Sequence, residues 1–186
     1  MDRFIGFDLP FSGLKILKRK EIHDGRGSFS RLFCSLDLLK FGWETPIAQI
    51  NRSCSTATGT IRGLHFQRPP HGEMKLVSCI RGRVYDVVVD LRKNSPTFLQ
   101  WHAEYLSSDN CNALMIPQGF AHGFQSLTDE TELIYVHSAP FWPDAEGGLN
   151  PMDPYLDIVW PIPISNISLR DSKHPYLDSN FEGIES

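Results

Sequence analysis

The residues best suited to chemistry lie in one short stretch, 62–67, which reads Arg-Gly-Leu-His-Phe-Gln and is followed by Lys75. Arg62 and His65 stand among apolar neighbours in a region that is otherwise patterned to be buried. A buried cation destabilises a fold unless another group pairs with it. The stretch therefore indicates either a wet cavity or a site where these charged side chains bind a ligand.

Four side chains are the strongest candidates for a functional site: His65, Lys75, His122 and Tyr135. Each adjoins apolar residues on an expected strand or at a strand edge, and an apolar pocket with a few convergent polar groups is the usual form of a small-molecule site. Each also has a purely structural alternative: a core histidine, a surface lysine, a histidine that holds a turn, or a packed tyrosine. Arg62 and Lys75 beside His65 favour a site for an anionic substrate such as a diphosphate.

A metal site receives little support from the sequence. Metal-binding jelly rolls often carry a His-x-His pair with a nearby Glu, and the stretches after His65 and His122 do not supply this pair. His65, His71 and His122 could still meet in space, but we expect no metal. The four cysteines form no Cys-x-x-Cys pair, which favours buried thiols in a reducing compartment over a zinc site.

Composition and charge narrow the class of protein. With 186 residues, 41% hydrophobic and 22% charged, the chain is expected to form one domain over residues 1–186. The net charge of −4 argues against nucleic-acid binding, which needs a basic surface. No run approaches a membrane span and the first residues have no apolar signal core, so we expect a cytoplasmic protein with no membrane partner.

Short segments of alternating polarity, separated by turns rich in Gly, Pro and Asn, predict an all-β protein. The predicted strands cover 14–22, 28–33, 48–53, 60–66, 75–80, 84–91, 98–106, 113–116 and 132–138. The Arg-Gly-Arg sequence at 81–83 predicts a hairpin, and short helices are expected near 36–41 and 168–171, the latter capped by Ser168. The architecture is expected to be an antiparallel sandwich or barrel, and a jelly roll fits the number of strands. The C-terminal segment 140–186 is expected to pack over the sandwich or barrel. Residues 140–163 of this segment are expected to be irregular.

Several motifs in a fixed order resemble the dTDP-4-dehydrorhamnose 3,5-epimerase family. They are Asp24–Phe29, Gln49-x-Asn51-x-Ser53, Arg62–Gln67, Val84–Arg92, Ser95–Phe98, Ile116–Phe124 and Arg170-Asp171. Together they span nearly the whole chain, which makes the resemblance specific where a lone motif would not.

The resemblance implies a homodimeric, cupin-type jelly roll that uses no metal and no organic cofactor and acts on a nucleotide-linked 4-keto-6-deoxyhexose. It implies a catalytic base at His65, oriented by Asp171. It implies an acid at Tyr135 and an enolate-stabilising cation at Lys75. The positions matched to substrate binding are Arg62, His122 with Asp86 as its partner, Gln49, Asn51, and Arg26 and Phe29, the last two reaching the nucleotide across the dimer interface.

This chemistry explains the residue types. The protons at C3 and C5 are both α to the C4 ketone, so the removal of either gives an enolate. A histidine titrates near neutral pH and suits the base, and a neutral tyrosine suits the acid on the opposite face. The ammonium group of Lys75 would place positive charge where the enolate oxygen develops.

Two positions depart from the family pattern. Phe141 stands where a tyrosine is usual, which removes a hydroxyl near the sugar and bears on which centre is inverted. Arg31 stands where a glutamate is common, which bears on the nucleotide.

The alternatives are an epimerase that inverts one centre or uses another nucleotide sugar, a sugar-binding jelly roll without catalysis, and a metal-dependent cupin oxygenase. The presence of all four catalytic types disfavours the second, and the missing His-x-His pair disfavours the third.

Overall fold

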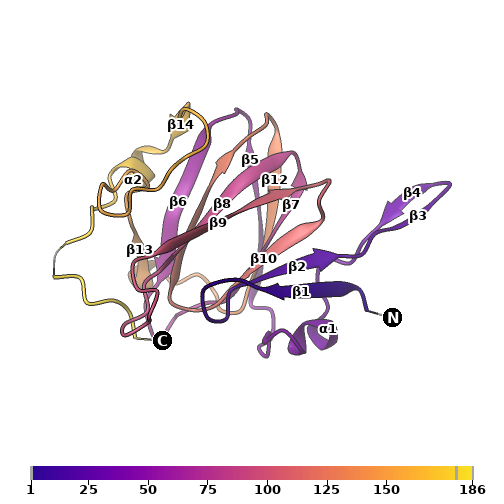
Figure 1. The fold of residues 1–186 in the computed structure, drawn as a ribbon, viewed down its shortest axis with the longest axis horizontal. Helices are drawn as coiled ribbons and strands as arrows, with labels where there is room; N and C mark the ends of the chain where they lie inside the picture. Colours follow the sequence, from indigo (N-terminus) through magenta and orange to yellow (C-terminus); the bar gives the residue numbers. More distant parts are fainter. Residues whose placement is uncertain (1, 179, 186) are drawn as a thin grey trace.

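The fold is a sandwich of two antiparallel sheets, seen in the computed structural model, which describes residues 2–178 and 180–185 (Figure 1). The first sheet has the order β1 (Phe4–Asp8), β2 (Lys15–Arg19), β10 (Asn112–Ile116), β7 (Lys75–Arg81), β12 (Thr131–His137) and β5 (Gln49–Ser55). The second has the order β13 (Glu146–Gly148), β6 (Thr60–Gln67), β11 (Phe120–Ser126), β8 (Arg83–Asp90) and β9 (Trp101–Ser107), and β14 (Asn166–Ile167) pairs in parallel with β6. The all-β jelly-roll prediction is confirmed.

The central strands β7 and β8 are covered on both faces, which explains why most of their residues are buried. One apolar cluster lies between the sheets and includes Val77, Val88 and Phe124. A second includes Trp43 and Leu76 and joins the outer face of the first sheet to α1 (Ser35–Leu39). A third cluster lies beneath the C-terminal segment and contains, among others, Leu64, Val89, Leu149, Leu156 and Ile184. These layers hold the central strands rigidly on both sides.

The C-terminal segment runs along the outside of β6. It includes the short 3-10 helix η1 (Pro143–Ala145), β13, β14 and α2 (Leu169–Ser172). The predicted cap of α2 is confirmed, because Ser168 Oγ accepts a hydrogen bond from the Asp171 amide at 2.9 Å. α2 lies beside β6, and Figure 1 shows them as neighbours.

The prediction of a hairpin at residues 81–83 is wrong. β7 pairs with β10 and β12, whereas β8 pairs with β11 and β9, so the chain crosses from one sheet to the other at this turn. Gly82 adopts a φ of +75°, which glycine accepts without steric cost. A turn signal identifies a reversal but does not identify the sheet to which the next strand belongs.

Two further strand predictions need correction. The sequence analysis predicted no strand between residues 116 and 132 and so missed β11, a fully buried strand that carries His122. The strand expected at 28–33 ends at Phe29, as β4 (Gly27–Phe29) of a hairpin with β3 (Ile22–Asp24). Figure 1 shows this β3–β4 hairpin projecting away from the sandwich.

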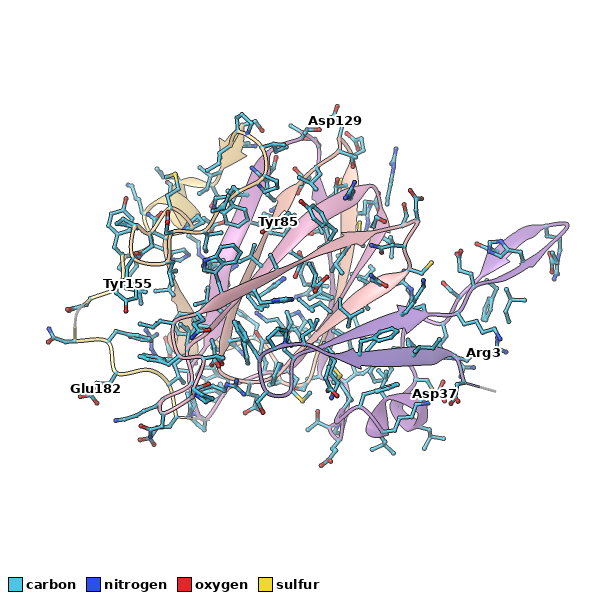
Figure 2. The ribbon with its side chains drawn as sticks, viewed as in Figure 1. Arg3, Asp37, Tyr85, Asp129, Tyr155 and Glu182 are labelled. Atoms are coloured by element: carbon cyan, nitrogen blue, oxygen red, sulfur yellow. The ribbon has the colours of Figure 1, made fainter. Side chains whose placement is uncertain are left out.

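The turns at the end of the sandwich are tied together by side chains. Asp129, labelled in Figure 2, lies between β11 and β12 and accepts hydrogen bonds from the amide and the hydroxyl of Thr58, at 2.8 and 2.7 Å.

Among the described residues, no helix has the length and apolar character needed to cross a membrane.

Candidate active site

A cavity of about 530 Å³ is lined by β5, β7 and β12 of the first sheet, by β6 and β11 of the second, and by residues of the C-terminal segment. It contains most of the residues predicted from the sequence. Those that line it are Gln49, Asn51, Arg62, His65, Lys75, His122, Tyr135 and Asp171. The fold therefore gathers into one place residues that are as much as 122 positions apart (171 − 49).

A β-bulge explains why Arg62 and His65 both reach the cavity. Residues three apart on a regular strand point to opposite faces. Here His65 pairs with His122 and Arg62 pairs with Phe124. The two pairs are three residues apart on β6 but only two residues apart on β11. The extra residue rotates the strand by one position and brings both side chains to the same side.

Gly63 makes the bulge possible. Its φ is +110°, and a Cβ atom there would lie 2.7 Å from the Cα of Gly123 and from the carbonyl oxygen of His122. The two backbones therefore approach as closely as they do because both positions are glycine.

His65 is held by Asp171. Its Nε2 lies 2.8 Å from Asp171 Oδ1, while Asp171 Oδ2 accepts a hydrogen bond from the Gly63 amide at 3.1 Å. Burial raises the pKa of Asp171, but the hydrogen bonds from His65 and Gly63 outweigh this effect and hold that pKa below its usual value. The aspartate is thus ionised, and it fixes Nε2 as the protonated nitrogen and leaves Nδ1 of His65 as an acceptor.

A second histidine–carboxylate pair lies beside the first. His122 Nε2 lies 2.9 and 3.0 Å from the two carboxylate oxygens of Asp86, which is completely buried on β8. His122 and His65 are direct partners in the β6–β11 register. The predicted pairing of His122 with Asp86 therefore agrees with the geometry.

Tyr135 is a neutral hydroxyl donor at the wall of the cavity. Its oxygen lies 3.1 Å from Ser53 Oγ, and its ring centroid lies 6.1 Å from that of His122 and 6.2 Å from that of His137. Burial raises the pKa of Tyr135 well above its usual value. The phenol therefore keeps its proton at neutral pH and is able to donate it.

Lys75 lies in a buried ionic cluster that sequence reasoning missed in part. Its Nζ is 3.2 Å from Glu73 Oε1, and Glu73 Oε2 is 2.7 Å from His137 Nδ1. Strand alternation was the signal that could have found both partners, because Glu73 precedes Lys75 by two residues and His137 follows Tyr135 by two.

Arg62 and Gln49 form hydrogen bonds with neighbouring parts of the cavity wall. Arg62 donates to Ser55 Oγ at 3.1 Å and to the Cys54 carbonyl at 2.8 Å. Gln49 Oε1 accepts a hydrogen bond from the Phe141 amide at 2.9 Å, and the Phe141 ring lines the cavity. These contacts leave hydrogen-bonding capacity on Arg62 and on the amide of Gln49 for a ligand.

The described residues that line the cavity do not include Arg26 or Phe29. Both lie on the exposed β3–β4 hairpin, where Arg26 pairs with Asp24 at 2.6 Å. Arg31 lies nearby and pairs with Asp37 at 2.9 Å. Within one chain these residues are not brought to the site.

One set of side chains could hold a metal ion. Nitrogen atoms of His65 and His174 and a carboxylate oxygen of Asp171 lie within 4.8 Å of one another. This group differs from the one considered above, since His71 stacks instead on Trp142 with ring centroids 4.3 Å apart. Burial lowers the pKa of His174, which lies 3.6 Å from Asp171.

The cavity brings together a histidine held by an ionised carboxylate, a phenol that keeps its proton and a buried ammonium group. This set is suited to moving protons on carbon atoms next to a carbonyl group, with the ammonium stabilising the oxyanion. The fold and the site therefore define an acid–base enzyme of the jelly-roll class.

Comparisons with known proteins identify the family. A family model described as dTDP-4-dehydrorhamnose 3,5-epimerase matches residues 8–179. An epimerase of that name from Sinorhizobium fredii is 37% identical over 178 residues, which cover 95% of this chain and 91% of the relative. A dTDP-4-dehydrorhamnose 3-epimerase from Streptomyces niveus is 42% identical over 130 residues, which cover 70% of this chain and 62% of the relative.

A solved structure agrees. The crystal structure of dTDP-4-dehydrorhamnose 3,5-epimerase from Bacillus anthracis with TDP and pyrophosphate bound is 38% identical, with a TM-score of 0.90 over 94% of this chain and 99% of that one. The chain belongs to the dTDP-4-dehydrorhamnose 3,5-epimerase family, and it is an isomerase of the epimerase type.

Proposed function

We propose that this protein epimerises a dTDP-linked 4-keto-6-deoxyhexose, converting dTDP-4-dehydro-6-deoxyglucose to dTDP-4-dehydrorhamnose by inversion at C3 and C5. The observation that carries the proposal is the His65–Asp171 pair, which faces the same cavity as Tyr135 and Lys75. The names of the relatives support the substrate, as does the TDP bound to the Bacillus anthracis epimerase.

In the proposed reaction, Nδ1 of His65 removes the proton from a carbon next to the C4 ketone. The electron pair of the broken C–H bond moves to the carbonyl oxygen and forms an enolate, whose negative charge the Lys75 ammonium stabilises. The enolate then collapses, and the carbon takes a proton from the Tyr135 hydroxyl on the opposite face, so that the centre is inverted. Asp171 keeps the His65 ring oriented throughout and stabilises the imidazolium that forms.

Nucleotide binding is assigned to polar side chains that line the cavity. Arg62 offers a guanidinium group to the diphosphate, because this cation matches phosphate oxygens in two-pronged hydrogen bonds. Gln49 and Asn51 lie on β5 at the cavity wall and offer amide groups to the nucleotide or the sugar. His122 is assigned to the sugar.

We also propose that the enzyme is a homodimer. Exposed apolar side chains gather on β1, at one edge of the first sheet, and on the neighbouring hairpin, among them Ile5, Phe7 and Phe29. Exposed apolar surface of this kind is typical of an interaction site. In a dimer built on β1, the β3–β4 hairpin would carry Arg26 and Phe29 to the nucleotide in the cavity of the partner.

Inversion at a single centre is a second candidate, and one residue favours it. Phe141 lines the cavity where the family usually has a tyrosine, so the sugar meets no hydroxyl at this position. The Streptomyces niveus relative is named as a 3-epimerase. The two candidates differ only in whether C5 is inverted as well as C3.

Product analysis tests the proposal. The purified protein is incubated with dTDP-4-dehydro-6-deoxyglucose, and the configurations at C3 and C5 are read by NMR from the proton couplings. We expect inversion at both centres, whereas inversion at C3 alone would select the second candidate. No conversion of the dTDP sugar, together with turnover of the UDP or GDP analogue, would overturn the assigned nucleotide, and no conversion of any of them would overturn the epimerase itself.

A further inference from the structure

Lys75 shares its end of the cavity with two side chains that the proposed reaction does not use, Glu73 and His137. All three side chains are about nine-tenths buried, with exposures of 9% each. One carboxylate bridges the other two groups, because Glu73 Oε1 lies 3.2 Å from Lys75 Nζ and Oε2 lies 2.7 Å from His137 Nδ1. Three buried ionisable groups in contact call for an explanation, since burial of a charge costs stability unless it is paired.

The strands hold this cluster in a fixed arrangement. His137, the last residue of β12, lies directly opposite Lys75, the first residue of β7. The ladder continues one step beyond both strands, since the Ser138 amide donates to the Met74 carbonyl at 3.1 Å and the Met74 amide donates to Ser138 Oγ at 2.7 Å. These bonds fix the backbone next to Glu73, so its carboxylate approaches Lys75 from a rigid position.

The neighbours of His137 determine its tautomer. Nδ2 of Asn51 lies 3.3 Å from Nε2 of His137, and an amide NH₂ group can only donate. In this arrangement Nε2 accepts from Asn51, and Nδ1 donates to Glu73.

The carboxylate remains ionised in this setting. Burial raises the pKa of Glu73, but the hydrogen bond from His137 and the charge of Lys75 outweigh it, so the pKa of Glu73 lies below its usual value. With one carboxylate oxygen occupied by His137, Glu73 offers the other to Lys75. The ammonium then uses one of its three hydrogens on Glu73 and keeps the others for a substrate oxygen.

We propose that Glu73 and His137 are positioning residues that hold the Lys75 ammonium where the enolate oxygen develops. Without Glu73, a flexible lysine side chain would sample several rotamers and would meet the oxygen less often. Without His137, the carboxylate would be free to turn and would lose the link that His137 provides to Asn51 on β5. The inference rests on the proposed function, because it assigns these residues a part in that reaction.

The first test is the substitution Glu73→Gln, which keeps the size of the side chain and removes its charge. We expect kcat to fall about 10- to 100-fold, as for other groups that orient a catalytic residue, with KM changed less than about threefold. His102→Ala is the matched control, since His102 pairs with Glu104 at 2.8 Å on β9 and neither residue is among those that line the cavity. This control is expected to retain the kcat of the wild type.

A second pair of variants addresses His137 and does not depend on the folding of the first. His137→Asn keeps an N–H donor near the place of Nδ1, whereas His137→Leu removes it. We expect the asparagine variant to retain several-fold more kcat than the leucine variant, at equal binding of dTDP. Equal kcat in the two variants would overturn the role assigned to His137.

A double-mutant cycle shows whether Glu73 acts through Lys75. In a Lys75→Met background, measured by the slow exchange of substrate hydrogen for deuterium, Glu73→Gln should cause little further loss. A loss as large as in the wild-type background would overturn the inference, because Glu73 would then act independently of the lysine. If the wild type itself exchanges no hydrogen, the proposed function fails and the inference with it; if the wild type is active and Glu73→Gln keeps full kcat, only the inference fails.

Discussion

Tyr135 and His65 have different tasks in the proposed reaction, and the difference can be measured. The phenol is half-buried, keeps its proton and lines the cavity, whereas Nδ1 of His65 is left as an acceptor. Removal of the hydroxyl should abolish the return of a proton on the opposite face without preventing its first removal. The two steps should therefore separate in a single variant.

For Tyr135→Phe we expect inversion to fall about 10²- to 10³-fold, while exchange of the substrate proton with heavy water falls much less. NMR of the recovered sugar gives both quantities. Tyr105→Phe, an exposed tyrosine on β9, is the control. If exchange and inversion fell together, Tyr135 would not be a dedicated acid.

Asp171 links catalysis to stability at low pH. Its pKa is lowered by its partners in the folded protein, so its contribution to stability is fully present above the unfolded value, roughly pH 3.9, and is lost as the pH falls through the lowered value. We expect Asp171→Asn to reduce kcat about 10²-fold and to destabilise the fold at pH 7, with the difference from wild type shrinking below about pH 4. Urea unfolding at pH 7 and pH 3 measures this; an equal difference at both pH values would contradict the assignment.

Sequence reasoning found most residues of the site and two of its pairs, but not the partners of Lys75. Resemblance brought together His65 and Asp171, which no spacing rule links across 106 positions. Glu73 and His137 were not singled out, because only the β7–β12 register places His137 opposite Lys75 and next to Glu73. Register is a tertiary property, and a single sequence carries it only weakly.

The bulge in β6 is the element on which the site depends most. A regular strand would turn either Arg62 or His65 away from the cavity. The unusual placement of two polar residues three apart was visible in the sequence, but the bulge that reconciles them was not. It depends on the contact of Gly63 with Gly123 of another strand.

Gly63→Ala tests this dependence. The added methyl group would meet backbone atoms at 2.7 Å in a conformation that disfavours side chains, so we expect a loss of about 1–3 kcal/mol in the free energy of unfolding, and a lower kcat as His65 shifts. Gly25→Ala is the control, because a Cβ there meets nothing within 4 Å. Thermal unfolding of both variants would decide the matter, and equal stability would contradict the role given to the bulge.

At the scale of the whole molecule, the sequence predicts which segments form strands more directly than it predicts which sheet each strand joins. The segments 75–80 and 84–91 were correctly predicted as strands, and most of their residues are buried. The crossing between sheets at Gly82 was read as a hairpin, since local turn chemistry is the same in both cases. Fold class was therefore accessible from the sequence, and the path of the chain through the two sheets was not.

The proposed dimer makes a prediction for the whole molecule. The double variant Ile5→Lys, Phe7→Glu places charges on the exposed face of β1, and we expect it to be monomeric by light scattering and to bind dTDP more weakly, since Arg26 and Phe29 would no longer reach a partner. Tyr155→Glu is the control: Tyr155 is exposed and lies at the opposite end of the molecule from Arg3 in Figure 2. A wild type that is itself monomeric, or a double variant that stays dimeric, would contradict the proposed interface.

The most direct test of the proposed mechanism is solvent hydrogen exchange. The wild type and His65→Asn are incubated in heavy water with dTDP-4-dehydro-6-deoxyglucose, and deuterium at each carbon is read by NMR. We predict deuterium at C3 and C5 with the wild type and at least a 10²-fold slower exchange with the variant, because the base has been removed. Inversion of the sugar without deuterium, or exchange that survives in His65→Asn, would contradict proton abstraction by His65.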